Sequence, residues 1–205
     1  MDEDHLLQHY LNCRDLAATQ LEKWVCLIDP ETKHLREDAT IFTQMVTGLA
    51  ILNYPSWILT APVSNFYLDQ MAREYLLFDV HPSIEEQQQG ERRSKKKMSN
   101  NHKLLIPMDL SDIDFVINAA LFPIGDQHVI RKLKDMKKIA LYFMADQFDL
   151  DEDQIGLYFH CHPDNSIDHL HLHIVDLTQQ TEYFNKIQEE GKNIPLDTII
   201  QFLEM

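Results

Sequence analysis

Apolar residues and histidines alternate strictly from residue 169 to residue 175, where the sequence reads HLHLHIV. Successive side chains of a β-strand point to opposite faces, so this pattern predicts a strand with one apolar face and one face of imidazoles. We expect the apolar face to enter a core and the opposite face to line a surface that can carry chemistry. The histidines of that predicted surface are His169, His171 and His173.

Further strands are predicted on both sides of this segment. Residues 155–162 and 167–176 form two predicted strands around a Pro-Asp-Asn turn at residues 163–165, because proline and short polar residues favour turns. Two earlier runs rich in apolar residues predict strands at 75–80 and 102–107. The sequence therefore predicts a sheet to which the histidine segment contributes one strand.

Helical spacing of apolar residues predicts helices at both ends of the chain and in its middle. Asp126 is the expected N-cap of the clearest helix, and Pro195 fits the first turn of a C-terminal helix. Residues 4–21 read as an amphipathic helix in which His5 and His9 stand four apart. That spacing binds metal in zinc proteases, but the glutamate that follows the first histidine there is missing here, so a surface helix is expected.

A length of 205 residues suits one domain that carries an extension. We expect residues 1–60 to form a helical N-terminal extension and residues 61–205 to form the main domain. Residues 85–101 are too polar and basic to offset the entropy of ordering them, so a solvated, disordered insertion is predicted. A basic arm over a phosphate site and a targeting patch are the alternatives for this insertion.

The net charge of −15 limits the classes of partner. Phosphate polymers and anionic membranes would be repelled by most of the surface, so neither bulk nucleic acid nor a membrane is an expected partner. The acidic start of the chain lacks the features of a signal peptide, and three cysteines without a CxxC pair fit reduced thiols. These features predict a cytoplasmic protein.

The HLHLHIV segment fits the His-φ-His-φ-His-φ-φ signature of the histidine triad superfamily, where φ is apolar. Residues 165–169 resemble the Gln-Ser-Val-x-His that precedes the triad in its nucleotide-binding branch. Residues 157–163, which follow a long helix, are similar to the C-terminal domain of scavenger mRNA decapping enzymes. The resemblance covers roughly residues 126–176 and is weaker from about residue 75.

The resemblance implies an α+β fold with an antiparallel sheet and flanking helices, usually as a homodimer that binds a nucleotide or dinucleotide. It also implies hydrolysis or transfer of nucleotides at phosphoanhydride or phosphoramidate bonds through a nucleotidyl-histidine, without cofactor or metal. His171 would be the nucleophile, flanked by the catalytic residues His169 and His173. The expected phosphate-binding residues are Ser166, Asn165 and His102. Cap dinucleotides, dinucleoside polyphosphates and nucleoside phosphoramidates are the candidate substrates, and the decapping-like segment favours the first.

The residue types support this chemistry in their own right. Imidazole is the side chain that titrates nearest to neutral pH, so a neutral His171 can attack phosphorus. A protonated flanking histidine is expected to stabilise the charge that develops on the phosphate. Phosphoryl-type transfer asks mainly for positioning and charge stabilisation, and a row of histidines can supply both.

Two alternatives remain open from the sequence. One is a catalytically inactive nucleotide-binding protein on the same fold, because fold does not guarantee chemistry. This alternative is favoured by the missing glycine-rich approach to the triad and by acidic Asp164 and Asp168 close to it. The other is a histidine-ligated metal site, in which two triad histidines and either His160 or His162 hold zinc. Cys161 is expected to face the core.

Overall fold

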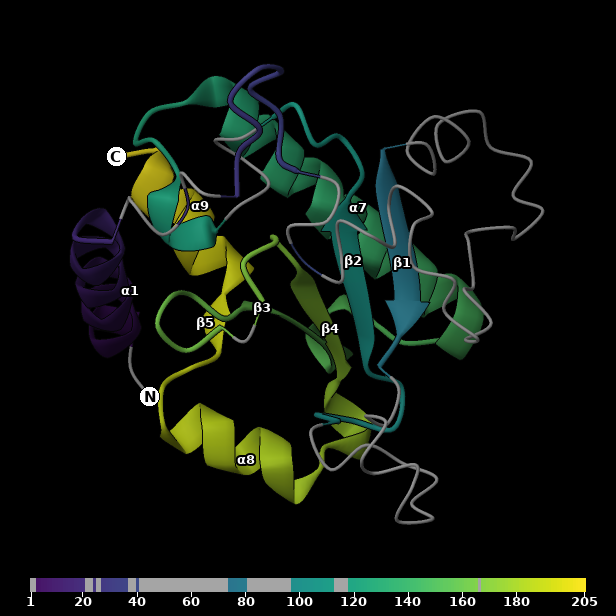
Figure 1. The fold of residues 1–205 in the computed structure, drawn as a ribbon. Coiled ribbons are helices and arrows are strands. Elements are labelled where there is room, and N and C mark those ends of the chain that lie inside the picture. Colours follow the sequence, from purple (N-terminus) through teal and green to yellow (C-terminus); the bar gives the residue numbers. More distant parts are fainter. Residues whose placement is uncertain are drawn as a thin grey trace, which may run out of the picture.

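The protein is described by a computed structural model (Figure 1). The residues that it describes are 3–20, 24, 27–36, 40, 74–80, 97–112, 118–165 and 167–205. Within them, a central sheet is flanked by helices on both of its faces. None of the helices in this part of the chain combines the length and the apolar character needed to cross a membrane.

The sheet holds five strands in the described part of the chain, in the order β1-β2-β4-β3-β5. All four pairings are antiparallel. The strands are β1 (Tyr75–Asp79), β2 (Lys103–Pro107), β3 (Ile155–Phe159), β4 (Leu172–Asp176) and β5 (Ile194–Pro195). The predicted α+β class with an antiparallel sheet is confirmed.

The longest helix begins where the sequence predicts. Asp126 caps α7 (Gln127–Phe148), and its carboxylate accepts hydrogen bonds from the backbone N–H groups of His128 and Val129. The predicted C-terminal helix is α9 (Leu196–Leu203), which follows Pro195 directly. The remaining helical elements are α1 (Glu3–Ala18), α8 (Glu182–Glu189) and the short 3₁₀ turns η1 (Ala119–Leu121), η2 (Glu152–Gln154) and η3 (Leu177–Gln179).

Apolar side chains pack on both faces of the sheet. On one face, Leu172 and Ile174 of β4 join Leu133 and Met136 of α7 in the main core, and all four are fully buried. On the other face, a second cluster forms between β4 and α8. Its buried members are Met98, Val175, Phe184 and Ile187. The sheet is therefore covered from both sides, with α7 running across its main-core face (Figure 1).

Helix α1 packs against the main domain. Tyr10 and Cys13 belong to the main core, and the Tyr10 hydroxyl donates to the carbonyl oxygen of Ala119 in η1 at 2.8 Å. The Arg14 guanidinium donates to the carbonyl oxygen of Phe122 at 2.6 Å. The described part of the predicted extension thus shares the core of the domain that follows it, while residues 41–73 lie outside the described residues.

The end of the predicted polar insertion is packed. Residues 85–96 lie outside the described residues, but Met98 and Ser99 are fully buried. The Thr181 hydroxyl, at the start of α8, donates to the carbonyl oxygen of Lys97 at 2.6 Å. This burial differs from the solvated end that composition predicts, because Met98 belongs to the apolar cluster under α8.

Candidate active site

The histidine segment is only partly a strand. Strand β4 begins at Leu172, so His173 lies on it while His169 and His171 lie in the connection that leads into it. The predicted strand at 167–176 was too long at its start. On the neighbouring strand, Pro107 has no N–H to continue the ladder, and its carbonyl oxygen meets the Nε2 atom of His169 at 3.1 Å instead.

The alternation of faces is confirmed, but the exposure of the histidines is not. Leu170 is buried in the main core, as predicted for the apolar positions. His169, His171 and His173 are also buried, with 0%, 6% and 8% of their surface exposed. The expectation that they line an open surface was wrong, because this face of the sheet carries its own packed layer.

Hydrogen bonding fixes which nitrogen of His171 carries the proton. The Nδ1 atom of His171 lies 2.7 Å from the carbonyl oxygen of His169, which can only accept. In a neutral imidazole one nitrogen donates and the other accepts, so Nδ1 carries the hydrogen. Nε2 of His171 is then the unprotonated nitrogen and carries the lone pair that a nucleophilic imidazole uses.

A second chain of bonds orients His173. The backbone N–H of Met98 donates to Nδ1 of His102 at 3.1 Å, so the hydrogen of neutral His102 sits on Nε2. That nitrogen lies 3.0 Å from Nδ1 of His173, which therefore accepts and leaves the hydrogen of His173 on its Nε2. Among the described residues, no acceptor meets this buried N–H. His173 thus presents a donor that a phosphate oxygen could satisfy.

The predicted strand at 155–162 was too long at its end, because β3 ends at Phe159. Of the two histidines that follow β3, only His160 shares the triad's face. Its ring centroid lies 4.2 Å from that of His173, and its Nε2 lies 2.8 Å from the side-chain oxygen of Asn193. His162 instead packs its ring edge-on to Trp24, with 5.3 Å between ring centroids. Asn193 could not be found from the sequence, because it comes from a loop far along the chain.

Burial keeps the cluster neutral. It lowers the pKa of His169 and of His171 to about 4 in each case. The pKa values of His102 and His173 fall well below their ordinary range, and that of His160 is also lowered, again mainly by burial. At pH 7 all of these imidazoles are uncharged. The expected protonated flanking histidine is therefore wrong for this conformation.

The predicted phosphate-binding residues differ in their placement. His102 lies behind His173, hydrogen-bonded to it. Asn165 directs its amide nitrogen to the carbonyl oxygen of Ile167 at 3.0 Å and to the Asp168 carboxylate at 2.9 Å. Both amide hydrogens of Asn165 thus hold the turn together. Ser166 lies outside the described residues.

The space beside His171 is small. A cavity of about 10 Å³ is bounded there by η1, by the end of β3, by Asn165 and Ile167 and by residues 169–171. That volume holds about one water molecule and no nucleotide. A larger cavity of about 430 Å³ lies between β1, β2 and α7, with both acidic and basic side chains in its wall.

Metal-binding geometry occurs in a different place from the triad. Among the described residues, the side chains whose ligand atoms converge are His9, Cys13 and Asp164, with all three atoms within 4.8 Å of one another. The triad histidines and His160 do not form such a group in this part of the chain. Cys161 is buried in the main core, as predicted.

One protein-family model matches a segment of the chain that contains this site. Residues 92–188 match the protein-family model described as "Scavenger mRNA decapping enzyme C-term binding". No curated protein matches the chain. The matched segment makes up a little under half of the chain and contains β2, α7, β3 and β4.

The match confirms the similarity to scavenger decapping enzymes and extends it on both sides of residues 126–176. All three triad histidines and His102 fall within it. Helix α1 and the C-terminal helix α9 lie outside it. Together with the antiparallel sheet and its flanking helices, the match gives an α+β fold like that of the histidine triad proteins, as predicted.

Proposed function

We propose that the protein is a nucleotide hydrolase or nucleotidyl transferase that acts through a nucleotidyl-histidine intermediate on His171. The observation that supports this best is the pair of oriented imidazoles, His171 with an unprotonated Nε2 and His173 with an N–H donor. The bonds cleaved would be phosphoanhydrides or phosphoramidates. Similarity to scavenger decapping enzymes favours cap dinucleotides as substrates over dinucleoside polyphosphates and phosphoramidates.

In the first step, the Nε2 lone pair of His171 attacks the phosphorus of the bound nucleotide. A P–N bond forms as the bond from phosphorus to the leaving oxygen or nitrogen breaks. The leaving group takes the electron pair, and a nitrogen leaving group also takes a proton from solvent and departs as the amine. The ring then carries positive charge, which the carbonyl oxygen of His169 stabilises through the Nδ1–H bond. In the second step, water or another acceptor breaks the P–N bond and restores neutral His171.

His173 contributes a hydrogen bond to a phosphate oxygen through Nε2–H. His102 acts through His173, whose Nδ1 it holds in the accepting state, and so is a positioning residue. The turn that Asn165 stabilises sets the approach to His169, and direct phosphate contact by Asn165 requires its amide to change partners. Ser166 remains a predicted phosphate contact. No metal ion or cofactor takes part in either step.

A second candidate is a nucleotide-binding protein without turnover. The cavity of about 10 Å³ beside His171 favours it, because the described residues that bound this cavity leave no space in it for a nucleotide. The two candidates share the nucleotide or dinucleotide ligand, and they differ in whether a covalent adduct forms.

The deciding experiment incubates the full chain with a cap dinucleotide, a dinucleoside polyphosphate and a nucleoside phosphoramidate, with products separated by chromatography. His171→Asn is the informative variant, because the asparagine amide replaces Nδ1–H toward the His169 carbonyl and removes the nucleophile. Turnover should fall by at least about 10⁴-fold. The matched control is His128→Asn on α7, where the side chain is 47% exposed and bonds to Asp112 and not to a triad histidine.

An acid-labile, base-stable nucleotide adduct on His171 would support the hydrolase. Ligand binding without products or adduct, in the wild type, would establish the binding protein instead. Turnover that survives His171→Asn would refute the assignment of the nucleophile.

A further inference from the structure

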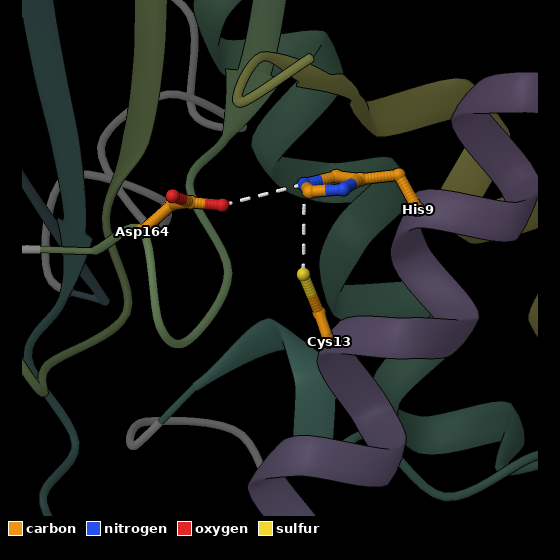
Figure 2. Close-up of side chains that lie close together, drawn as sticks. All are labelled: His9, Cys13 and Asp164. Carbon is orange, nitrogen blue, oxygen red and sulfur yellow. Dashed lines mark hydrogen bonds and ion pairs between the residues drawn. The ribbon is translucent and has the colours of Figure 1, made fainter. Parts of the chain in front are cut away.

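Three side chains outside the triad converge where α1 meets the connection between β3 and β4 (Figure 2). His9 and Cys13 stand one turn apart on the same face of α1, as residues at i and i+4 of a helix do. Asp164 reaches toward them from the connection (Figure 2). The site thus joins parts of the chain that are far apart in the sequence.

The distances fit a shared ion. Nε2 of His9 lies 3.3 Å from a carboxylate oxygen of Asp164 and 3.7 Å from Sγ of Cys13. Zinc bonds of about 2.3 Å to sulfur and about 2.0–2.2 Å to nitrogen or oxygen, at tetrahedral angles, place ligand atoms about 3.4–3.6 Å apart. Adjustments of a few tenths of an ångström would bring these two pairs to that spacing, and the third pair, Sγ of Cys13 and the carboxylate of Asp164, lies within 4.8 Å.

The same geometry argues against a cysteine nucleophile. A Cys-His-Asp relay needs one ring nitrogen toward the thiol and the other toward the carboxylate, whereas here Nε2 of His9 faces both. Burial, reinforced by the Asp164 carboxylate, also raises the pKa of the Cys13 thiol to about 12, the opposite of an activated thiol. A cation is the partner that thiolate, imidazole and carboxylate have in common.

We propose that His9, Cys13 and Asp164 bind one zinc ion, with water completing its tetrahedral coordination. A thiolate and a carboxylate balance the charge of the ion, which suits a site where Cys13 is 1% exposed. The other Asp164 oxygen lies 3.7 Å from the Lys192 ammonium, so the oxygen nearer to His9 is the ligand. The ion would fasten α1 to the connection that leads into the triad, independently of the catalytic proposal.

The test titrates the metal-free full-length protein with cobalt(II), which takes the place of zinc and reports its ligands by absorbance. One equivalent should bind, with a thiolate-to-cobalt charge-transfer band in the near ultraviolet and the intense visible bands of tetrahedral cobalt. Added zinc should remove both features. Zinc should also raise the thermal unfolding midpoint of the wild type.

Two variants and a matched control assign the ligands. Cys13→Ser should abolish the charge-transfer band and weaken zinc binding by at least about 10–100-fold. Asp164→Asn should weaken binding comparably and keep the band, and its position in a partly exposed turn keeps it informative if the buried Cys13 variant does not fold. His5→Gln changes a histidine one turn earlier on α1, outside the cluster, and should bind as the wild type does.

Absence of cobalt binding, or bound cobalt without a thiolate band, would overturn the proposal. Loss of binding in His5→Gln would move the metal to the His5 and His9 pair and would also overturn it. Turnover of nucleotides is a separate readout, because none of the three ligands belongs to the proposed catalytic machinery. Failure of one proposal is therefore distinguishable from failure of the other.

Discussion

At the scale of single residues, the two nitrogens of each central imidazole are made different by their hydrogen bonds. The carbonyl oxygen of His169 holds the hydrogen of His171 on Nδ1, and His102 holds the hydrogen of His173 on Nε2. The sequence predicts strands that include His102 and His173, but not that the two rings meet, and β2 begins one residue after His102. Their meeting follows from the register that pairs Leu104 of β2 with His173 of β4.

Replacement of His102 tests the positioning of His173. His102→Asn keeps an acceptor for the Met98 N–H but removes the bond to His173, so kcat should fall by about 10²-fold or more, as for loss of a preorganised donor. His102→Gln places an amide N–H near the lost Nε2–H and should recover much of that activity. Equal losses in both variants would indicate a packing role instead.

The low pKa of His171 predicts an unusual acid limit for activity. Since burial lowers this pKa to about 4, the nucleophile stays neutral at pH 5, where an ordinary histidine would be mostly protonated. The profile of kcat/KM, which reports the free enzyme, should therefore decline only near pH 4. A dinucleoside polyphosphate is the appropriate substrate, because it has no terminal phosphate that titrates near pH 6. A midpoint near 6.5 would contradict this expectation.

At the scale of elements, α7 supports the sheet behind the triad. Its buried residues, among them Leu133 and Met136, pack against the face of β4 opposite to the histidines. Its first turn relies on Asp126, whose carboxylate accepts from two backbone N–H groups. Those N–H groups have no partner within the helix, so the cap contributes to the stability of the first turn of α7.

Removal of this cap should lower stability without affecting the chemistry. Asp126→Ala should reduce the free energy of unfolding by about 1 kcal/mol, measured as a shift of the urea midpoint. Asp126→Asn retains a side-chain acceptor and is the matched control. Its free energy of unfolding should fall by well under half of the loss expected for Asp126→Ala. A full loss in the asparagine variant would indicate that charge near the helix start, rather than the hydrogen bonds, is responsible.

At the scale of the whole molecule, the protein encloses a face of uncharged histidines inside a packed sheet. Burial lowers the pKa of each member of this set, which consists of His102, His160, His169, His171 and His173. The unfolded chain therefore binds more protons than the folded protein between about pH 6.5 and pH 4. Stability should fall as the pH drops through this window and should be independent of these groups above it.

This acid sensitivity can be measured as urea midpoints from pH 7.5 to pH 4.5. A single shift such as that of His169, from 6.5 to about 4, corresponds to a loss on the order of 3 kcal/mol at pH 4. His169→Gln keeps a donor toward the Pro107 carbonyl and removes one titrating group, so its stability should fall less steeply. Parallel curves for the variant and the wild type would contradict the assignment. Homodimerisation, expected from the resemblance, is open to measurement by light scattering on the same samples.

Local patterns in the sequence were sufficient for the start of α7, the C-terminal helix and the apolar face of β4, while the fold class followed from the resemblance. Period-two alternation placed Leu172 and Ile174 in the core, and the Asp126 cap and helical spacing located α7. These features depend on the side chain's own position along the chain, and so they can be read one segment at a time. The triad signature and the segment at 157–163 likewise sufficed for the similarity to decapping enzymes.

Only the tertiary structure decided the state of the histidines. Whether a polar face of a strand is open or covered depends on what packs over it, and here Met98 and α8 come from distant parts of the chain. Burial lowers the pKa of His171, and its bond to the carbonyl oxygen of His169 fixes the hydrogen of its ring on Nδ1. The convergence of α1 with Asp164 has the same origin. These segments are more than a hundred residues apart, and a contact between distant segments produces no repeating pattern in a single sequence.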